Sequence, residues 1–351
     1  MARSLFAPTT LRRAIARLGF VQADPIRAPA RAQDLTLRHR VVAYRAGDLE
    51  RRYATLAIEE DFFVNYGFLP RAKHALMHPR AIRGRWGPKQ ERHARELLAF
   101  VRERGEAHPR EVDARFAHGR VRNWFGGSSN ATTRLLDVMH YRGLLRVARR
   151  DSGIRVYAAR EPSPPASAAE RRARLDALVD VVVNTYAPLP ARSLTGLVGR
   201  LRFGAPQWRK DLRGALQRAK QRLAQARIED VNWYWPAGDA PESALHAPDD
   251  EVRLLAPFDP LVWDRQRFEL LWGWAYHFEA YTPPAKRRLG YYALPLLWRD
   301  HVIGWGNLSV VEGTLKTEIG YVAGRAPRER AFRRALDREL ERMAQFLGVA
   351  R

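Results

Sequence analysis

Cysteine is absent from this chain of 351 residues. Its absence excludes disulfides, a thiolate nucleophile and any metal or cluster site held by cysteine, and it is typical of a protein from the reducing cytoplasm. Long hydrophobic runs are also missing, because no apolar stretch approaches the roughly 20 residues that a membrane-spanning helix requires. Lysine is scarce as well, since only six of the 61 basic residues are lysines.

Acidic residues are too few to balance the basic ones. The 61 lysines and arginines face 38 aspartates and glutamates, which gives a formal net charge of +23 at pH 7. A charge of this size predicts a polyanionic partner, because each neutralised phosphate releases condensed counterions. Nucleic acid is the leading candidate and an anionic membrane surface is the second. The excess of arginine, together with much alanine, also fits a GC-rich coding bias, so not every arginine is expected to be a contact.

The length predicts two or three structural units, and the hydrophobic content of 46% predicts globular folding. Near the start, Thr9 or Thr10 caps a helix whose apolar residues fall on one face from Leu11 to Leu18, and Gly19 stops it. A mixed stretch at residues 27–77 predicts two helices.

Residues 89–158 predict three helices followed by a β-hairpin, whose turn is Asp151-Ser152-Gly153. This order is typical of a winged helix, in which one helix enters a groove of DNA and the hairpin touches the backbone. Ser128 or Ser129 caps the third helix, and Gly143 stops it. The three helices are expected at residues 89–105, 108–116 and 126–143.

After a linker rich in proline, serine and alanine, the helical pattern recurs. Helices are predicted over residues 170–186, 191–201 and 208–225, and "IEDVNWYWP" at residues 228–236 predicts a strand. Two units of one shape suggest tandem winged helices, and the N-terminal region is a candidate for another.

From Glu251 onward the pattern is rich in β-strands, with turns at Arg299-Asp300 and Glu312-Gly313, and it ends in an amphipathic helix at residues 328–347. The predicted fold class is therefore α+β, with tandem winged-helix (helix-turn-helix) domains, a small C-terminal β-barrel and a terminal helix. The expected division is an N-terminal winged-helix-like domain at 1–86, a second winged helix at 87–160, a linker at 161–169, a third winged helix at 170–238, and the barrel-like domain with its helix at 250–351.

The segment "FVQADPI", residues 20–26, places an amide and a carboxyl two positions apart. Pro25 disfavours the α region for Asp24, so Gln22 and Asp24 project to one side of an extended segment, with Cα atoms roughly 6.5–7 Å apart. The pair could share one water, which the carboxylate would activate and the amide would orient. The alternative is an aspartate that caps a turn before proline and a glutamine bonded to backbone, and spacing alone favours that alternative.

No metal site is predicted. His74 and His78 are four positions apart and could share a helical face, but "HALMH" lacks the glutamate that a zinc hydrolase uses as its base. The histidines are therefore expected to be structural or on the surface.

A carboxylate pair, Asp259 and Asp264, lies in "FDPLVWDR". Turn formation and pairing with Arg265 or Arg267 explain both residues more simply than catalysis does. No glycine-rich loop carries the lysine that would cradle a phosphate.

Basic and polar residues on helices, a hairpin and a turn are the expected contacts with DNA. For any single residue a solvated surface is the simpler explanation, but the whole set, with a charge of +23, favours nucleic acid. The expected DNA-binding residues are Ser129, Asn130, Thr133 and Arg134 on the third helix of the second domain, Arg146, Arg149 and Arg155 on its hairpin, Arg209, Lys210 and Arg213 in the third domain, and Lys286, Arg287 and Arg288 beside aromatic residues.

Over most of its length the sequence resembles the AlkZ/YcaQ-type DNA glycosylases, winged-helix proteins that release alkylated bases and unhook DNA interstrand crosslinks. The resemblance rests on "GFVQADPIRAPARAQDLTLRHRV", on "NWFGGSSNATTRLLDVMHYRGLLRVARR", and on the long stretch from "LLAPFDPLVWDRQRFELL" to "LWRDHVIG". It implies three tandem winged helices and a β-barrel around a concave surface of DNA size. It also implies a catalytic Q-x-Q or Q-x-D motif, of which Gln22 and Asp24 match the Q-x-D form of the YcaQ-like branch.

Because no lysine lies beside the motif, we expect a monofunctional hydrolase that needs no metal and no cofactor. An N7-alkylated purine is cationic and already a good leaving group, so the enzyme needs a carboxylate near C1′ to stabilise the oxocarbenium-like state and activate water. Asp24 would do this while Gln22 holds the water. Bifunctional lyases use a lysine amine, and the lysine nearest in sequence is Lys73. The expected partner is double-stranded DNA with alkylated or crosslinked purines. A monomer in the bacterial cytoplasm, associated with the nucleoid and not with a membrane, is expected.

Two other classes of protein remain open on the sequence alone. A winged-helix regulator without enzymatic activity explains the charge and the helices equally well. A protein associated with RNA or with a membrane surface is a weaker third interpretation.

Overall fold

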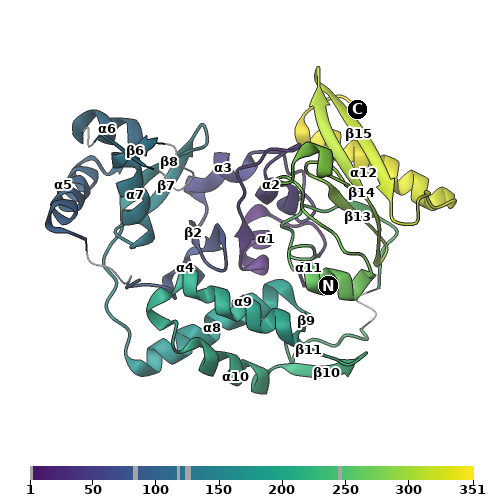
Figure 1. The fold of residues 1–351 in the computed structure, drawn as a ribbon, viewed down its shortest axis with the longest axis horizontal. Coiled ribbons are helices and arrows are strands. Elements are labelled where there is room, and N and C mark those ends of the chain that lie inside the picture. The colour runs from purple at the N-terminus through teal and green to yellow at the C-terminus, as the bar shows by residue number, and fades with distance from the viewer. Residues whose placement is uncertain (1–2, 82–85, 117–118, 123–127, 244–246) are drawn as a thin grey trace. The chain divides into compact units, whose positions relative to one another are not determined.

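The computed structural model describes residues 3–81, 86–116, 119–122, 128–243 and 247–351 (Figure 1). Residues 123–127, which begin the second stretch of the family resemblance, lie outside these ranges. The chain divides into two compact units. Unit 1 contains residues 1–49, 179–197 and 216–351, and unit 2 contains residues 50–178 and 198–215.

The N-terminal segment of unit 1 begins with α1 (Leu11–Leu18), as predicted. The Thr10 side chain accepts a hydrogen bond from the Arg13 N–H, and Gly19 ends the helix in a left-handed conformation. The apolar face of α1 is buried, which fixes the start of β1 (Val21–Gln22). The helix α2 (Ala32–Leu37) follows and is buried along its whole length.

The C-terminal part of unit 1 is an antiparallel sheet of four strands in the order β12-β13-β14-β15. The linear order leaves β12 and β15 at the edges, so the sheet is a half-barrel and not the barrel that the sequence predicted. The predicted turns are confirmed, since Arg299 and Glu312 have φ of 55° and 51°. The strands are β12 (Val252–Leu254), β13 (Leu294–Trp298), β14 (His301–Val311) and β15 (Thr314–Tyr321). The helix α12 (Arg330–Leu347) packs on β12.

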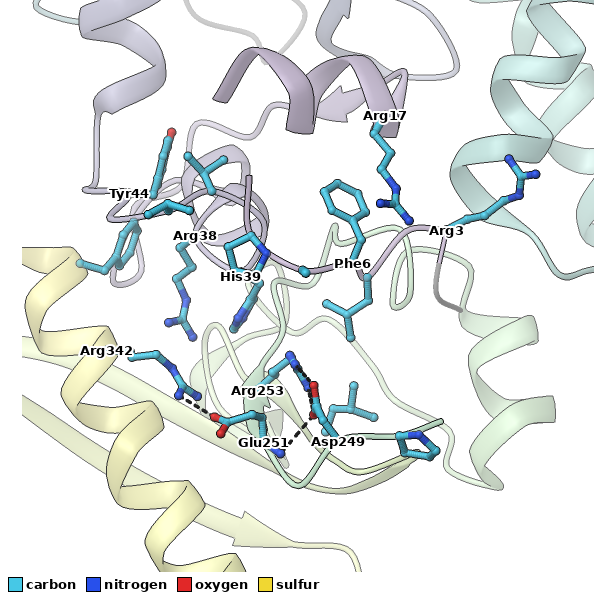
Figure 2. A pocket seen from close by; sticks show the side chains of 18 of the residues that line it. Arg3, Phe6, Arg17, Arg38, His39, Tyr44, Asp249, Glu251, Arg253 and Arg342 are labelled. Carbon is cyan, nitrogen blue, oxygen red and sulfur yellow. Dashed lines mark hydrogen bonds and ion pairs between the residues drawn. The ribbon is translucent and has the colours of Figure 1, made fainter. Parts of the chain in front are cut away.

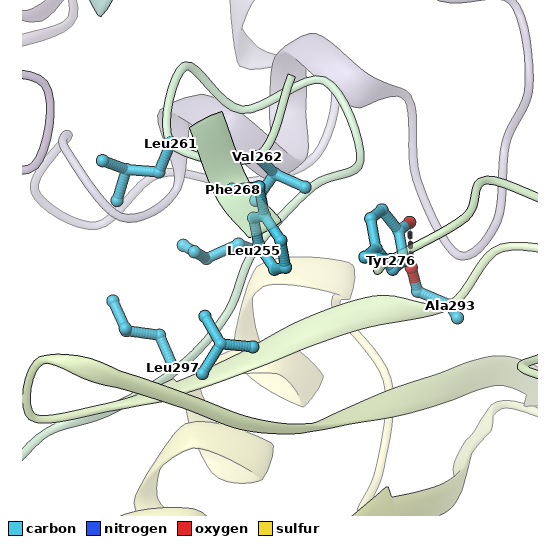
Figure 3. Packing of buried hydrophobic residues seen from close by; sticks show 8 residues of the cluster. Leu255, Leu261, Val262, Phe268, Tyr276, Ala293 and Leu297 are labelled. Carbon is cyan, nitrogen blue, oxygen red and sulfur yellow. Dashed lines mark hydrogen bonds between the residues drawn. The ribbon is translucent and has the colours of Figure 1, made fainter. Parts of the chain in front are cut away.

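A hydrophobic cluster lies between this sheet and the loops and helix that connect β12 to β13. Phe268 from α11 (Arg265–Trp272) packs with Leu255, Val262 and Leu297, all at most 1% exposed (Figure 3). Such burial contributes about 1.5–3 kcal/mol per large apolar side chain.

The segment "IEDVNWYWP", residues 228–236, was predicted to be one strand, but it belongs to a β-hairpin. The strands β10 (Ala224–Ile228) and β11 (Val231–Trp235) pair across Glu229-Asp230, and β11 also pairs with β9 (Leu189–Pro190). Both turn residues have positive φ, of 46° and 61°.

Residues 88–159 of unit 2 contain three helices and then a hairpin, as predicted. Gly105 and the Ser152-Gly153 turn, all with positive φ, end the first helix and close the hairpin. The third helix, however, is capped by Asn130 and not by Ser128 or Ser129. The elements are α5 (Pro88–Arg104), β4 (Glu106–Ala107), α6 (Pro109–Phe116), β5 (Arg120–Arg122), β6 (Ser128–Asn130), α7 (Ala131–Tyr141), β7 (Leu145–Asp151) and β8 (Ile154–Ala159), with a sheet in the order β4-β8-β7.

Near its start, unit 2 contains a hairpin that the sequence did not predict. The strands β2 (Ile58–Phe62) and β3 (Tyr66–Pro70) pair antiparallel, between α3 (Asp48–Arg52) with the short helix η1 (Tyr53–Thr55) and α4 (Arg71–Ala75).

Three long helices contribute residues to both units: α8 (Ala168–Tyr186), α9 (Ala191–Gly204) and α10 (Leu212–Arg222). They confirm the predicted helices of residues 170–225, and a short helix, η2 (Pro206–Trp208), precedes α10. None of the helices in the described ranges is both long and apolar enough to cross a membrane.

Candidate functional site

The segment around Asp24 is shaped by hydrogen bonds to its neighbours. Gln22 is the last residue of β1, and the chain leaves the strand at Ala23. The Ile26 N–H donates to Asp24 Oδ1 at 2.9 Å, and the Asp24 N–H donates to Gln33 Oε1 at 3.4 Å. The turn before proline that the simpler interpretation expected is therefore present, but it uses one carboxylate oxygen only.

The Asp24 carboxylate is half-buried. Burial raises its pKa above the usual aspartate range, and the hydrogen bond from the Ile26 N–H offsets part of that rise. Within the described part of the chain, Oδ2 has no hydrogen-bond or ion-pair partner. A partly desolvated carboxylate with a free oxygen is a common feature of functional sites, because desolvation makes it a stronger base.

The neighbouring amide of Gln22 is also incompletely satisfied. The residue is 5% exposed, and its Oε1 is buried without a hydrogen-bond partner among the described residues. Leaving such an acceptor unpaired costs about 1–3 kcal/mol, so a bound water or substrate group that donates to it is stabilised. Gln22 and Asp24, two positions apart, therefore each have a side-chain oxygen without a hydrogen-bond partner among the described residues.

A buried ion pair holds the segment after α2 in unit 1. Arg40 and Asp259 are both fully buried, and their side chains form two hydrogen bonds of 2.8 and 2.9 Å. Asp259 also accepts from the Leu261 N–H at 3.0 Å. The predicted turn role of Asp259 is thus confirmed, but its predicted pairing with Arg265 or Arg267 is wrong, because its partner lies 219 residues away.

The other member of that carboxylate pair, Asp264, has a separate structural role. It is the N-cap of α11, and its side chain accepts a hydrogen bond from the Arg267 N–H at 3.1 Å. This satisfies one of the free N–H groups of the first helical turn.

The polar face of α7 contains the first group of predicted DNA contacts. Asn130 Oδ1 accepts hydrogen bonds from the N–H groups of Thr132 and Thr133, at 2.8 and 3.2 Å, so this oxygen serves as the helix cap. Thr133 and Arg134 are exposed on the first turn of α7. Ser129 lies on β6, opposite Val121 of β5.

The three predicted DNA contacts on the β7–β8 hairpin differ in their burial and in their ion pairs with other residues of unit 2. Arg149 forms an exposed ion pair with Glu106 at 3.0 Å. Arg155 pairs with Asp137 at 3.2 Å and lies over the Tyr66 ring, and its pKa is raised by nearby negative groups despite burial. Arg146 is half-buried on β7.

The remaining predicted contacts lie before and within α10 and in the turn before β13. Arg209, Lys210 and Arg213 are all exposed. In the turn, the buried Glu279 carboxylate accepts from the backbone N–H groups of residues 288–290 at 2.7–3.2 Å. This holds Lys286 and Arg288 in exposed positions, while Arg287 is half-buried and stacks on Tyr291.

One group among the described residues has the composition of a metal site: Asp61, His74 and His78, all buried. His74 Nε2 lies 2.8 Å from Asp61 Oδ2 and 3.3 Å from His78 Nε2. Two guanidinium groups contact the same cluster, since Arg80 bonds Asp61 at 3.1 Å and Arg160 lies 3.3 Å from His74 Nδ1. These cations would repel a divalent ion, so the geometry favours a hydrogen-bonded network.

This network should make the stability of unit 2 depend on pH. Burial lowers the pKa of His74 to about 3 and that of His78 to about 4 from the usual 6.5. Between pH 6.5 and 4 the unfolded chain therefore binds protons that the folded chain does not, so stability is lost as pH falls. Urea unfolding of the wild type should show a slope of at most about 2.7 kcal/mol per pH unit from these two groups. His78→Gln should remove about half of that contribution, and an unchanged slope would contradict the account.

A pocket of about 1330 Å³ opens in unit 1. Arginines line it, and several are paired: Arg253 bonds Asp249 at 2.7 Å and Arg342 bonds Glu251 at 2.6 Å (Figure 2). Gln22 and Asp24 are not among its lining residues, so this pocket is separate from the motif.

The chain is thus a basic α+β protein with a partly desolvated carboxylate at Asp24 and, two residues earlier, a buried amide oxygen without a hydrogen-bond partner among the described residues. Residues 15–346 match the model of a family described as DNA glycosylase AlkZ-like, and the chain belongs to this family. The resemblance inferred from the sequence is thereby confirmed, and the family implies a DNA substrate.

Proposed function

We propose that the protein is a monofunctional DNA glycosylase that hydrolyses the N-glycosidic bond of cationic N7-alkylpurines, including those that form interstrand crosslinks. The observation that supports this most directly is the pair of free acceptor oxygens at Gln22 and Asp24. Membership of the AlkZ-like family supports the reaction class.

The chemistry follows from the charge of the substrate. A cationic purine leaves with the electron pair of the C1′–N9 bond and becomes neutral, so its departure needs little acid catalysis. The developing positive charge on the sugar is stabilised by the Asp24 carboxylate. The same carboxylate takes a proton from the attacking water as the water oxygen bonds to C1′. A crosslinked base is tethered to the opposite strand, so the proposed site is open enough to act without complete extrusion of the base.

The proposed DNA contacts use the winged-helix order of residues 88–159. We propose that α7 presents Thr133 and Arg134 to the duplex and that the β7–β8 hairpin follows the backbone. The exposed basic residues around α10 and before β13 would extend the same electrostatic contact. The monomeric state and the place on the nucleoid stay predictions.

Arg134 gives a test of this arrangement. Arg134→Ala should weaken duplex binding and lower the slope of log K against log salt by about one unit, because one phosphate contact is lost. The measurement is fluorescence anisotropy over a series of salt concentrations. Glu96→Ala, on the exposed face of α5, removes a charge of the opposite sign; it is the control and should not lower the slope. An Arg134→Ala slope equal to that of the wild type would exclude α7 from the interface.

The proposed function is tested by incubating the wild type with duplex DNA that contains N7-methylguanine. Strand breaks should appear only after alkali cleaves the abasic sites, because a monofunctional enzyme makes no break itself. EDTA should leave the rate of base release unchanged. Breaks without alkali would indicate lyase activity, and a rate no higher than that of spontaneous base loss would contradict the proposal.

A further inference from the structure

Residues 279–291, which precede β13 in unit 1 and are called the Tyr281 loop below, form a loop that is fixed by its own hydrogen bonds. The buried Glu279 carboxylate accepts from three consecutive backbone N–H groups near the end of the loop, at 2.7–3.2 Å. The Arg287 Nε–H donates to the Thr282 carbonyl at 2.8 Å. Two consecutive prolines between these residues also restrict φ. The loop therefore presents its outer side chains from a rigid backbone.

The Tyr281 side chain is 80% exposed, the highest value among the large hydrophobic residues that the structure describes. Its ring lies at 75° to that of Phe278, with centroids 6.0 Å apart. Phe278 in turn packs against Phe258 and Tyr292, with centroids 5.1 and 5.3 Å apart. A tyrosine supplies a large, flat contact area at a low cost in conformational entropy. The packed aromatic rings beneath it thus support one ring whose surface is open to a ligand.

The same loop is basic. Residues 280–291 contain three basic residues and no acidic one. Arg287 is used within the loop, because its guanidinium bonds the backbone and also lies 5.0 Å from the centroid of the Tyr291 ring. Lys286 and Arg288 are exposed, and neither side chain forms an ion pair with another residue in the described ranges. Two available cations and an exposed aromatic ring therefore share one rigid loop.

We propose that the Tyr281 loop binds an unpaired nucleobase of DNA, with the base stacked on the Tyr281 ring and the neighbouring phosphates in contact with Lys286 and Arg288. A polyanion with flat, apolar faces fits both features of the loop, and the family implies that this polyanion is DNA. A paired base inside a duplex has both faces covered by its neighbours, so only a base that has left the stack is accessible to a protein ring.

The inference rests on the DNA contacts proposed at Lys286 and Arg288, but not on the proposed hydrolysis. Phosphate contacts position the protein on any sequence, and their strength falls with salt. Stacking is tolerant of base identity and requires that the base be unpaired. The loop therefore adds a preference for DNA in which a base is already displaced, which the basic residues alone do not provide.

The test compares a duplex that has one bulged thymine with the same duplex fully paired, by fluorescence anisotropy. The wild type should bind the bulged duplex more tightly. Tyr281→Ala should weaken binding to the bulged duplex by about 5- to 100-fold, and leave binding to the paired duplex unchanged. Tyr281→Phe keeps the ring and should bind like the wild type. Leu270→Ala, which removes a side chain 44% exposed on α11 of the same unit, is the matched control and should also bind like the wild type.

Two further measurements separate stacking from charge and locate the base. Lys286→Ala and Arg288→Ala should each lower the slope of log K against log salt by about one unit on both duplexes, whereas Tyr281→Ala should not change it. With 5-iodouracil in place of the bulged thymine, ultraviolet light should crosslink the base to Tyr281 of the wild type, as located by mass spectrometry.

Several results would overturn the proposal. Equal affinity of the wild type for the two duplexes, or wild-type binding of the bulged duplex by Tyr281→Ala, would exclude stacking. Unchanged salt slopes in both Lys286→Ala and Arg288→Ala would exclude the loop from the DNA interface. A Tyr281→Ala defect on phosphatidylglycerol vesicles, without a defect on bulged DNA, would assign the loop to a membrane surface. None of these measurements involves base release, so the proposed hydrolysis stands or fails separately in the N7-methylguanine assay.

Discussion

Replacing Asp24 by asparagine should lower the single-turnover rate of base release by about 10³-fold, a typical loss for a group that acts as both base and electrostatic stabiliser. Duplex affinity should stay the same or increase, because the change removes a negative charge near the phosphates. Asparagine retains an Oδ1 that accepts from the Ile26 N–H, so the turn is preserved. The measurement is quenched-flow or gel-based base release alongside equilibrium binding.

The matched control for this prediction is Asp230→Asn. Asp230 lies in the exposed turn of the β10–β11 hairpin of the same unit, with a side chain 90% exposed, so its loss removes the same charge without touching the motif. It should release base at the wild-type rate. Unfolding of Asp24→Asn, or a loss of activity shared equally by both variants, would support the turn-capping interpretation instead.

Arg40→Ala should destabilise unit 1 by about 3–5 kcal/mol, because it leaves the fully buried Asp259 carboxylate without its counter-charge. Arg40 also donates to the Thr36 carbonyl at 2.6 Å, which would lose its partner as well. Urea unfolding followed by circular dichroism measures the change.

Two further variants separate the buried charge from other effects of the substitution. Arg12→Ala, on the exposed face of α1, should change stability by less than about 0.5 kcal/mol. The double change of Arg40→Met with Asp259→Leu should recover most of the loss, because apolar residues of similar volume need no counter-charge. A loss below about 1 kcal/mol in Arg40→Ala would show that Asp259 is solvated or neutral in the folded protein.

Helices and hairpins with local signals were predictable. The α1 helix has its cap, its apolar spacing and its stop within residues 10–19, and the β7–β8 turn has glycine at the position that needs positive φ. The β10–β11 hairpin was read as one strand, because Glu229 and Asp230 adopt positive φ without a glycine to indicate it.

The β2–β3 hairpin was missed for a different reason. Its first strand contains Glu59, Glu60 and Asp61, which suggest an exposed loop, yet all three are at most 2% exposed. Their partners include Arg80 and Arg150, which lie 19 and 90 residues away. Burial that depends on distant counter-charges leaves no periodic signal in the sequence.

The candidate site shows the same limit. Gln22 and Asp24 were predictable because their spacing and Pro25 are local. Gln33, whose side chain accepts a hydrogen bond from the Asp24 N–H, is a buried glutamine in a short helix. Nothing local distinguishes it from a core residue, so only the folded chain identifies it.

The most direct test of the central claim is release of N7-methylguanine from duplex DNA by the wild type and by Asp24→Asn under single-turnover conditions. We expect rapid release by the wild type, abasic sites that break only in alkali, and a rate for Asp24→Asn near the spontaneous one. Equal rates for the two proteins, with both folded and bound to the duplex, would contradict it.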